Sequence, residues 1–112
     1  MKGTYLGEFE EIVLLTVAVL ADKAYGNAIL EEIEKRTERS VNLSAIHASL
    51  YRLEKKGFVE ARKGDPSAVR GGKRKKYYSP TTYGLRSLSR AKELRDGLWD
   101  AIPSFILNRA AV

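Results

Sequence analysis

The chain has 112 residues, the size of one domain, and 44% of them are hydrophobic, so we expect a packed core. It has no cysteine and a single histidine, His47, which excludes disulfides, thiolate metal sites and cysteine nucleophiles. We expect neither a metal nor a cofactor. The longest apolar run, Ile12 to Ala21, falls short of the ~20 residues of a membrane span. Acidic residues stand where a signal peptide has a basic start, so we expect a cytoplasmic protein.

The net charge of +6 is distributed unevenly along the chain. Residues 1–34 carry two basic and seven acidic side chains, a balance of −5, whereas residues 35–112 carry eighteen basic and seven acidic ones, a balance of +11. One strongly basic portion is typical of a protein that binds a polyanion. The alternative is a basic surface that only keeps the protein soluble.

The first helix is predicted over residues 5–21, because apolar residues recur there at steps of three and four. These residues are Leu6, Phe9, Val13, Val17 and Leu20. Further apolar residues, Ile12, Leu15 and Val19, make the stripe wider than one packing partner needs. The glutamates of the first turns are expected to be solvated and to suit the positive end of the helix dipole. They are Glu8, Glu10 and Glu11.

Two further helices are predicted after a break at residues 22–26. The second helix runs to about Thr37 with Ile29 and Ile33 facing inward, and the third begins at Asn42 or Ser44, both good N-caps, and stops near Gly57. The buried edge of the third helix is expected to hold Leu43, Ile46, Leu50 and Leu53. Its opposite edge is expected to show Ser44, Ala45, His47, Ala48, Ser49, Tyr51, Arg52 and Lys55.

A hairpin and a last helix complete the chain. Residues 58–62 and 75–79 alternate like strands around a glycine-rich loop at residues 63–72. The alternation places one of Tyr77 and Tyr78 beneath the hairpin and the other outside. The last helix is predicted from Thr81 or Thr82 to Ile102, where a proline follows. The fold class is therefore mainly α with a small β-hairpin wing, a winged helix-turn-helix over residues 1–80 followed by a C-terminal helix over residues 81–112.

In a helix-turn-helix the second helix of the pair enters the DNA major groove. We therefore predict DNA contacts from Tyr25 at the start of the second helix and from the exposed edge of the third. The residues on the third helix are Asn42, Ser44, His47, Ser49, Tyr51, Arg52 and Lys55. Residues 70–76 hold five positive charges and no negative one, so the hairpin is predicted to hold phosphates or the minor groove. Its contact residues are Arg70, Lys73, Arg74 and Lys75.

The sequence resembles the PadR-like transcriptional regulators over about residues 6–90. The resemblance is carried by residues 6–15, by Tyr25-Gly26 with Ile29, by residues 50–57 and by residues 71–84. It implies a homodimeric, ligand-responsive repressor whose first and last helices form the dimer interface. Two-fold symmetry then predicts an operator that is an inverted repeat.

The chain departs from the pattern of that family at two places. His47 and Ala48 stand where the family usually has a tyrosine followed by a proline. Arg95 stands at about the place of a frequent tryptophan, and Trp99 comes one helical turn later. The resemblance implies a site for a small-molecule effector, with Phe9, Arg95 and Trp99 as the predicted ligand-binding residues. The alternative for Trp99 is packing along the last helix or at an interface.

Other functional classes remain as alternatives. A winged helix can serve as a protein interaction module, whose affinity should depend little on salt. An RNA-binding sheet would need paired exposed aromatics that this sequence does not offer. We do not expect an enzyme, because the sequence has no phosphate-cradling loop, metal cluster or nucleophile–base pair.

Overall fold

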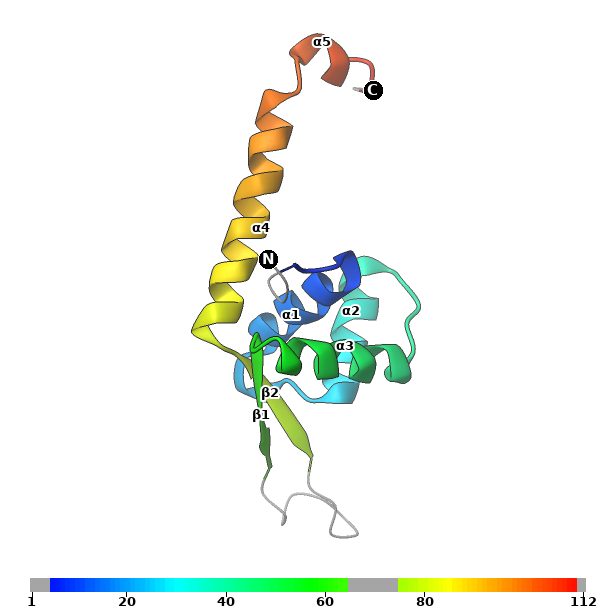
Figure 1. The fold of residues 1–112 in the computed structure, drawn as a ribbon. Coiled ribbons are helices and arrows are strands. Elements are labelled where there is room, and N and C mark those ends of the chain that lie inside the picture. Colours follow the sequence, from blue (N-terminus) through cyan, green and yellow to red (C-terminus); the bar gives the residue numbers. More distant parts are fainter. Residues whose placement is uncertain (1–4, 65–74, 111–112) are drawn as a thin grey trace.

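The computed structural model describes residues 5–64 and 75–110 (Figure 1). The elements are α1 (Glu8–Leu20), the 3-10 turn η1 (Ala21–Lys23), α2 (Gly26–Thr37), α3 (Leu43–Lys55), β1 (Val59–Lys63), β2 (Lys76–Pro80), α4 (Thr82–Ala101) and α5 (Ser104–Leu107). Helices α1, α2 and α3 pack together, the hairpin extends from one side of them, and α4 projects from another (Figure 1). The predicted mainly α fold with a hairpin wing is confirmed.

The core lies between α1, α2 and α3. Side chains spaced three and four residues apart on each helix are fully buried, which is how an amphipathic helix hides its apolar face. They include Val13, Leu14, Val17, Ile29, Ile33, Ile46, Leu50 and Leu53, and Phe58 joins them from the start of the hairpin. The predicted first helix was too long, because α1 begins only at Glu8 after an extended Gly7. The backbone N–H of Gly7 donates to Glu10 Oε1 at 3.1 Å.

The connection between α2 and α3 has a well-defined stop and start. Glu38 follows α2 in the left-handed conformation, with φ at 55°. Asn42 then caps α3, because its side-chain oxygen accepts a hydrogen bond from the backbone N–H of Ala45 at 2.8 Å. The first of the two predicted N-caps is thus confirmed, and the short turn fixes α3 against α2.

The hairpin is antiparallel, and Ala61 pairs with Tyr78 while Arg62 pairs with Tyr77. Tyr78 is 7% exposed and packs into the core, as the alternation predicted for one of the two tyrosines. Tyr77, on the other face, is half-buried because its ring meets the ring of Tyr25 edge-on, with centroids 5.5 Å apart. The hairpin therefore sits firmly on the start of α2.

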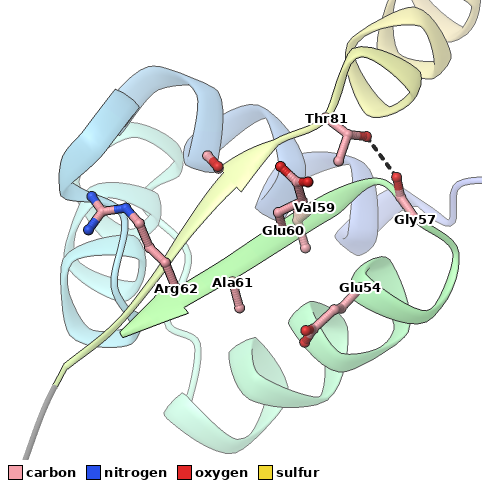
Figure 2. A pocket seen from close by; sticks show the side chains of 8 residues that line it. Glu54, Gly57, Val59, Glu60, Ala61, Arg62 and Thr81 are labelled. Atoms are coloured by element: carbon pink, nitrogen blue, oxygen red, sulfur yellow. Dashed lines mark hydrogen bonds between the residues drawn. The ribbon is translucent and has the colours of Figure 1, made fainter. Parts of the chain in front are cut away.

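Helix α4 starts against the connection between α3 and β1. The hydroxyl of Thr81 accepts from the backbone N–H of Gly84 and donates to the carbonyl of Gly57 at 2.7 Å (Figure 2). Gly84 is needed at this contact, because a Cβ there would lie 2.2 Å from the carbonyl oxygen of Phe58. The helix ends before Pro103, as predicted. Within residues 5–64 and 75–110, no helix is long and apolar enough to cross a membrane.

Candidate nucleic-acid interface

Helix α3 presents one exposed face, opposite the side that fills the core. Ser44, His47, Ala48, Tyr51 and Lys55 are all exposed and lie along this face. The first turns of α3 carry small and polar side chains. Further along the helix comes the large side chain of Tyr51, which is 62% exposed. The ammonium of Lys55 lies 5.4 Å from the centre of the Tyr51 ring. A helix of this shape can approach a groove closely at its first turns and place a cation further along.

His47 also covers the start of α2. A Cβ on Gly26 would lie 3.0 Å from Cε1 of His47, so the imidazole rests on the glycine while remaining exposed. The first turn of α2 and the exposed face of α3 therefore meet at His47. This residue was predicted from the sequence as a DNA contact, and its exposure leaves that contact geometrically possible.

The prediction that Ser49 lies on the exposed edge is wrong. Its exposed fraction is 0%. Ser49 is three residues after Ile46 and four before Leu53, so it shares their face of the helix and belongs to the core side. The guanidinium of Arg52 lies over it, with Nη2 at 3.4 Å from Oγ.

Arg52 is half-exposed, but its side chain is directed to α1 and not away from the protein. Its Nε donates to Glu10 Oε2 at 2.9 Å. The ammonium of Lys56 donates to the other oxygen of Glu10 at 2.8 Å and to the backbone carbonyl of Tyr5 at the same distance. The C-terminal end of α3 is thereby attached to the first turn of α1.

The expectation that the first-turn glutamates are solvated is wrong for Glu10 and Glu11. They are 7% and 8% exposed, whereas Glu8 is exposed. Glu11 meets Arg95 of α4, whose Nη1 contacts both carboxylate oxygens. Sequence reasoning missed these pairs, because their partners lie 42 to 84 residues away along the chain.

Cations and aromatic rings alternate toward the loop end of the hairpin, where Arg62 pairs with Tyr77. The ammonium of Lys75 lies 4.1 Å from the centre of the Tyr25 ring, and the guanidinium carbon of Arg62 lies 4.9 Å from that of Tyr77. Arg62 also donates to the backbone carbonyl of Asp22 at 3.1 Å. These contacts hold two positive charges beside the start of α2. The other predicted hairpin contacts, Arg70, Lys73 and Arg74, lie outside the described residues.

A shallow hollow of about 670 Å³ lies between the end of α3 and the hairpin (Figure 2). Figure 2 shows Glu54 of α3 and Glu60 of β1 at this hollow. Lys76 neutralises Glu54 only weakly, since the charged atoms are 3.9 Å apart. Two carboxylates repel phosphate. Arg62 also lines this hollow, so the cationic side of the hairpin is defined as its loop end, where Arg62 and Lys75 lie beside Tyr77 and Tyr25.

The three predicted ligand-binding residues are not brought together. Arg95 and Trp99 line a hollow of about 630 Å³ between α1 and α4, together with Leu15 and Leu88. Phe9 lines a different hollow, next to residues 40–42. The reason is helical geometry, because Phe9 and Glu11 are about 200° apart around α1 and face different neighbours.

Comparison with known proteins identifies the family. The model of the transcriptional regulator PadR-like family matches residues 14–90. A protein of Lysinibacillus sphaericus described as uncharacterized is 40% identical over 85 residues, which are 74% of this chain and 73% of that protein. The structure of a PadR family transcriptional regulator from Eggerthella lenta has 24% identity and a TM-score of 0.68, covering 88% of this chain and 86% of that one. A structure described as the complex hsRosR-S1 has 24% identity and a TM-score of 0.72, covering 99% and 97%. The two structures share the fold, and the family match shows that this chain belongs to the PadR-like family of transcriptional regulators.

Proposed function

We propose that the protein is a sequence-specific DNA-binding repressor that acts as a homodimer on an inverted repeat. The observation that carries this proposal is the exposed face of α3 next to the cationic side of the hairpin. Ser44, His47 and Tyr51 lie on one face of α3 and are exposed, so they can reach base edges when the helix lies in the major groove. Lys55 and Lys75 bind the flanking phosphates, which positions the helix without reading the sequence.

The unpartnered apolar surface of α4 supports a homodimer. Leu94, Leu98 and Trp99 are between 63% and 68% exposed. On α1, Leu15 and Val19 are 45% and 54% exposed, so the wide apolar stripe predicted for this helix is only partly covered within one chain. Leu15 and Trp99 line the same hollow, and exposed apolar surface that spans two helices marks an interaction site. A second copy pairing through α1 and α4 covers it and places two α3 helices in a two-fold arrangement.

The hollow between α1 and α4 is the proposed effector site. The hollow is lined by the apolar side chains of Trp99, Leu15 and Leu88 and by the ion pair of Lys92 and Asp96. A flat, mostly apolar molecule with one polar group fits such a lining. Such an effector changes DNA affinity only by binding one arrangement of the dimer more tightly than the other.

The experiment that tests the proposed function is in vitro selection of the purified protein on fragmented genomic DNA with excess non-specific competitor. Enrichment of an inverted repeat supports the proposal. Weak, salt-sensitive binding without enrichment would refute it. That outcome would favour the alternative of a protein interaction module, for which the exposed Tyr51 of α3 is a suitable anchor.

Two variants separate sequence readout from phosphate contact. His47→Ala should change the preferred bases at one position of each half-site and cost about 1–3 kcal/mol there. Lys75→Ala should weaken binding to all sequences alike and reduce the salt slope by about one. Fluorescence anisotropy at several salt concentrations measures both effects. Arg86→Ala, which removes one exposed charge from α4, is the control and should leave both unchanged.

A further inference from the structure

Two consecutive carboxylates of α1 connect it to two different helices. Glu10 binds Arg52 at 2.9 Å and Lys56 at 2.8 Å, at the C-terminal end of α3. Glu11 binds Arg95 in the middle of α4. The carboxylate side chains of Glu10 and Glu11 are only 9% and 11% exposed, whereas the side chains of Arg52 and Arg95 are 53% exposed, so water screens these pairs in part. The first turn of α1 therefore joins the helix proposed to read DNA to the helix proposed to form the dimer.

The contact of Glu11 with Arg95 acts far from the point where α4 is anchored. Helix α4 is fixed at its start, where Thr81 bonds Gly57 and Gly84 touches Phe58. Arg95 lies about 16 Å along the helix from Gly84. Among the ion pairs of residues 5–64 and 75–110, the pair of Glu11 and Arg95 is the one that joins α4 to another element.

The angle of α4 to α1 depends in part on this ion pair, which lies further along the helix than the buried Leu88. A rotation of roughly 10° about the start of α4 displaces Arg95 by about 3 Å, given the rise of the helix. Displacements of this size matter on DNA, because successive base pairs are about 3.4 Å apart. A change of this size in the angle of α4 is therefore large enough to affect the separation of two half-sites in the proposed dimer.

We infer that Glu11 and Arg95 are positioning residues that set the angle of α4 to α1, while Glu10 holds α3 to the same turn of α1. Together these contacts fix the half-site spacing that the dimer prefers. The inference rests on the proposed function, a homodimer on an inverted repeat. It does not require Glu10, Glu11 or Arg95 to touch DNA or an effector.

The test uses the operator obtained by selection, with its two half-sites kept constant and the spacer changed one base pair at a time. The wild-type protein and the variants Glu11→Gln and Arg95→Gln are titrated against each DNA by fluorescence anisotropy. For each variant we expect the affinity ratio between the preferred spacer and its neighbours to fall by about threefold or more. Glu8→Gln is the matched control, since Glu8 lies on the same helix and pairs with Arg39 on an exposed surface. It should keep the spacing preference.

Two further variants distinguish positioning from folding. Arg95→Lys keeps a positive charge for Glu11 and should recover most of the spacing preference. The double variant Glu11→Gln/Arg95→Gln should lose no more than either single variant, because both act through one contact. Single half-site affinity and the melting temperature serve as readouts of the fold.

The possible outcomes separate a failure of the proposed function from a failure of the inference. A wild-type protein that shows no preferred spacer contradicts the proposed function and with it the inference. A wild-type preference that Glu11→Gln and Arg95→Gln leave unchanged contradicts the inference alone. Loss of single half-site binding together with a lower melting temperature would assign the pair to folding and also overturn the inference.

Discussion

Glu10 holds a negative charge in a nearly closed position at the start of α1. Burial raises the pKa of its carboxyl group, but the hydrogen bonds donated by Lys56, by the backbone N–H of Gly7 and by Arg52 outweigh burial and hold the pKa below its ordinary value of 4.5. The charged form is therefore favoured in the folded protein. Its contribution to stability is present above pH 4.5 and is lost as the pH falls through the folded-state pKa.

Glu10→Gln tests this contribution. At pH 7 the substitution should lower the free energy of unfolding by about 2 kcal/mol, because Arg52 and Lys56 lose a charged acceptor. The difference from wild type should shrink as the pH is lowered below 4.5, where the wild-type carboxyl also becomes protonated. Chemical denaturation between pH 7 and pH 3 measures it, with the exposed Glu8→Gln as the control. A difference that stays constant over this range would contradict the assignment.

Single residues were also where prediction from the sequence failed. The periodicity of α3 placed Ile46, Leu50 and Leu53 correctly in the core, yet it left Ser49 outside, because a hydroxyl gives no apolar signal. Glu10 and Glu11 were likewise expected in solvent, because a carboxylate gives no apolar signal either. A buried polar group depends on a partner that is distant in sequence, and a local pattern contains no information about that partner.

Local signals at the ends of the elements gave more reliable predictions. Asn42 caps α3 and Thr81 caps α4, because each side chain accepts a hydrogen bond from an N–H three residues later, a contact within one turn. The hairpin was predictable from alternation, and its register places Tyr78 in the core. The side of the hairpin that carries cations was not predictable, because it depends on Tyr25 from another element.

Replacing each of the two glycines of α4 by alanine should have opposite effects on the free energy of unfolding. Gly84→Ala should lower the free energy of unfolding by about 3 kcal/mol or more, because the new Cβ meets the backbone carbonyl of Phe58, which cannot move aside. Gly97→Ala should raise it by about 0.5–1 kcal/mol, because nothing lies within 4 Å and alanine favours the helix. Thermal and urea unfolding compare the two. Equal effects would mean that α4 is not anchored at Phe58.

The described residues form an extended molecule. Its radius of gyration is 16.8 Å and its longest extent is 60 Å, whereas a compact chain of this length has a radius of gyration of about 13 Å. Much of the excess comes from α4, whose C-terminal part projects beyond the three-helix bundle (Figure 1). A long helix with leucines on its surface is marginal in water unless another surface covers it.

Leu98→Glu tests the proposed partner, a second copy of the chain. Leu98 is 65% exposed, so the substitution leaves the core intact but places a charge in the proposed interface. Sedimentation velocity should show a shift from dimer to monomer at micromolar concentration. Affinity for the complete inverted repeat should fall by about 100-fold or more, because the second half-site no longer benefits from the first. Affinity for a single half-site should not change. Lys35→Glu, which places the same charge on the exposed surface of α2, should remain dimeric. If Leu98→Glu also remains dimeric, copies of this chain do not pair through α4.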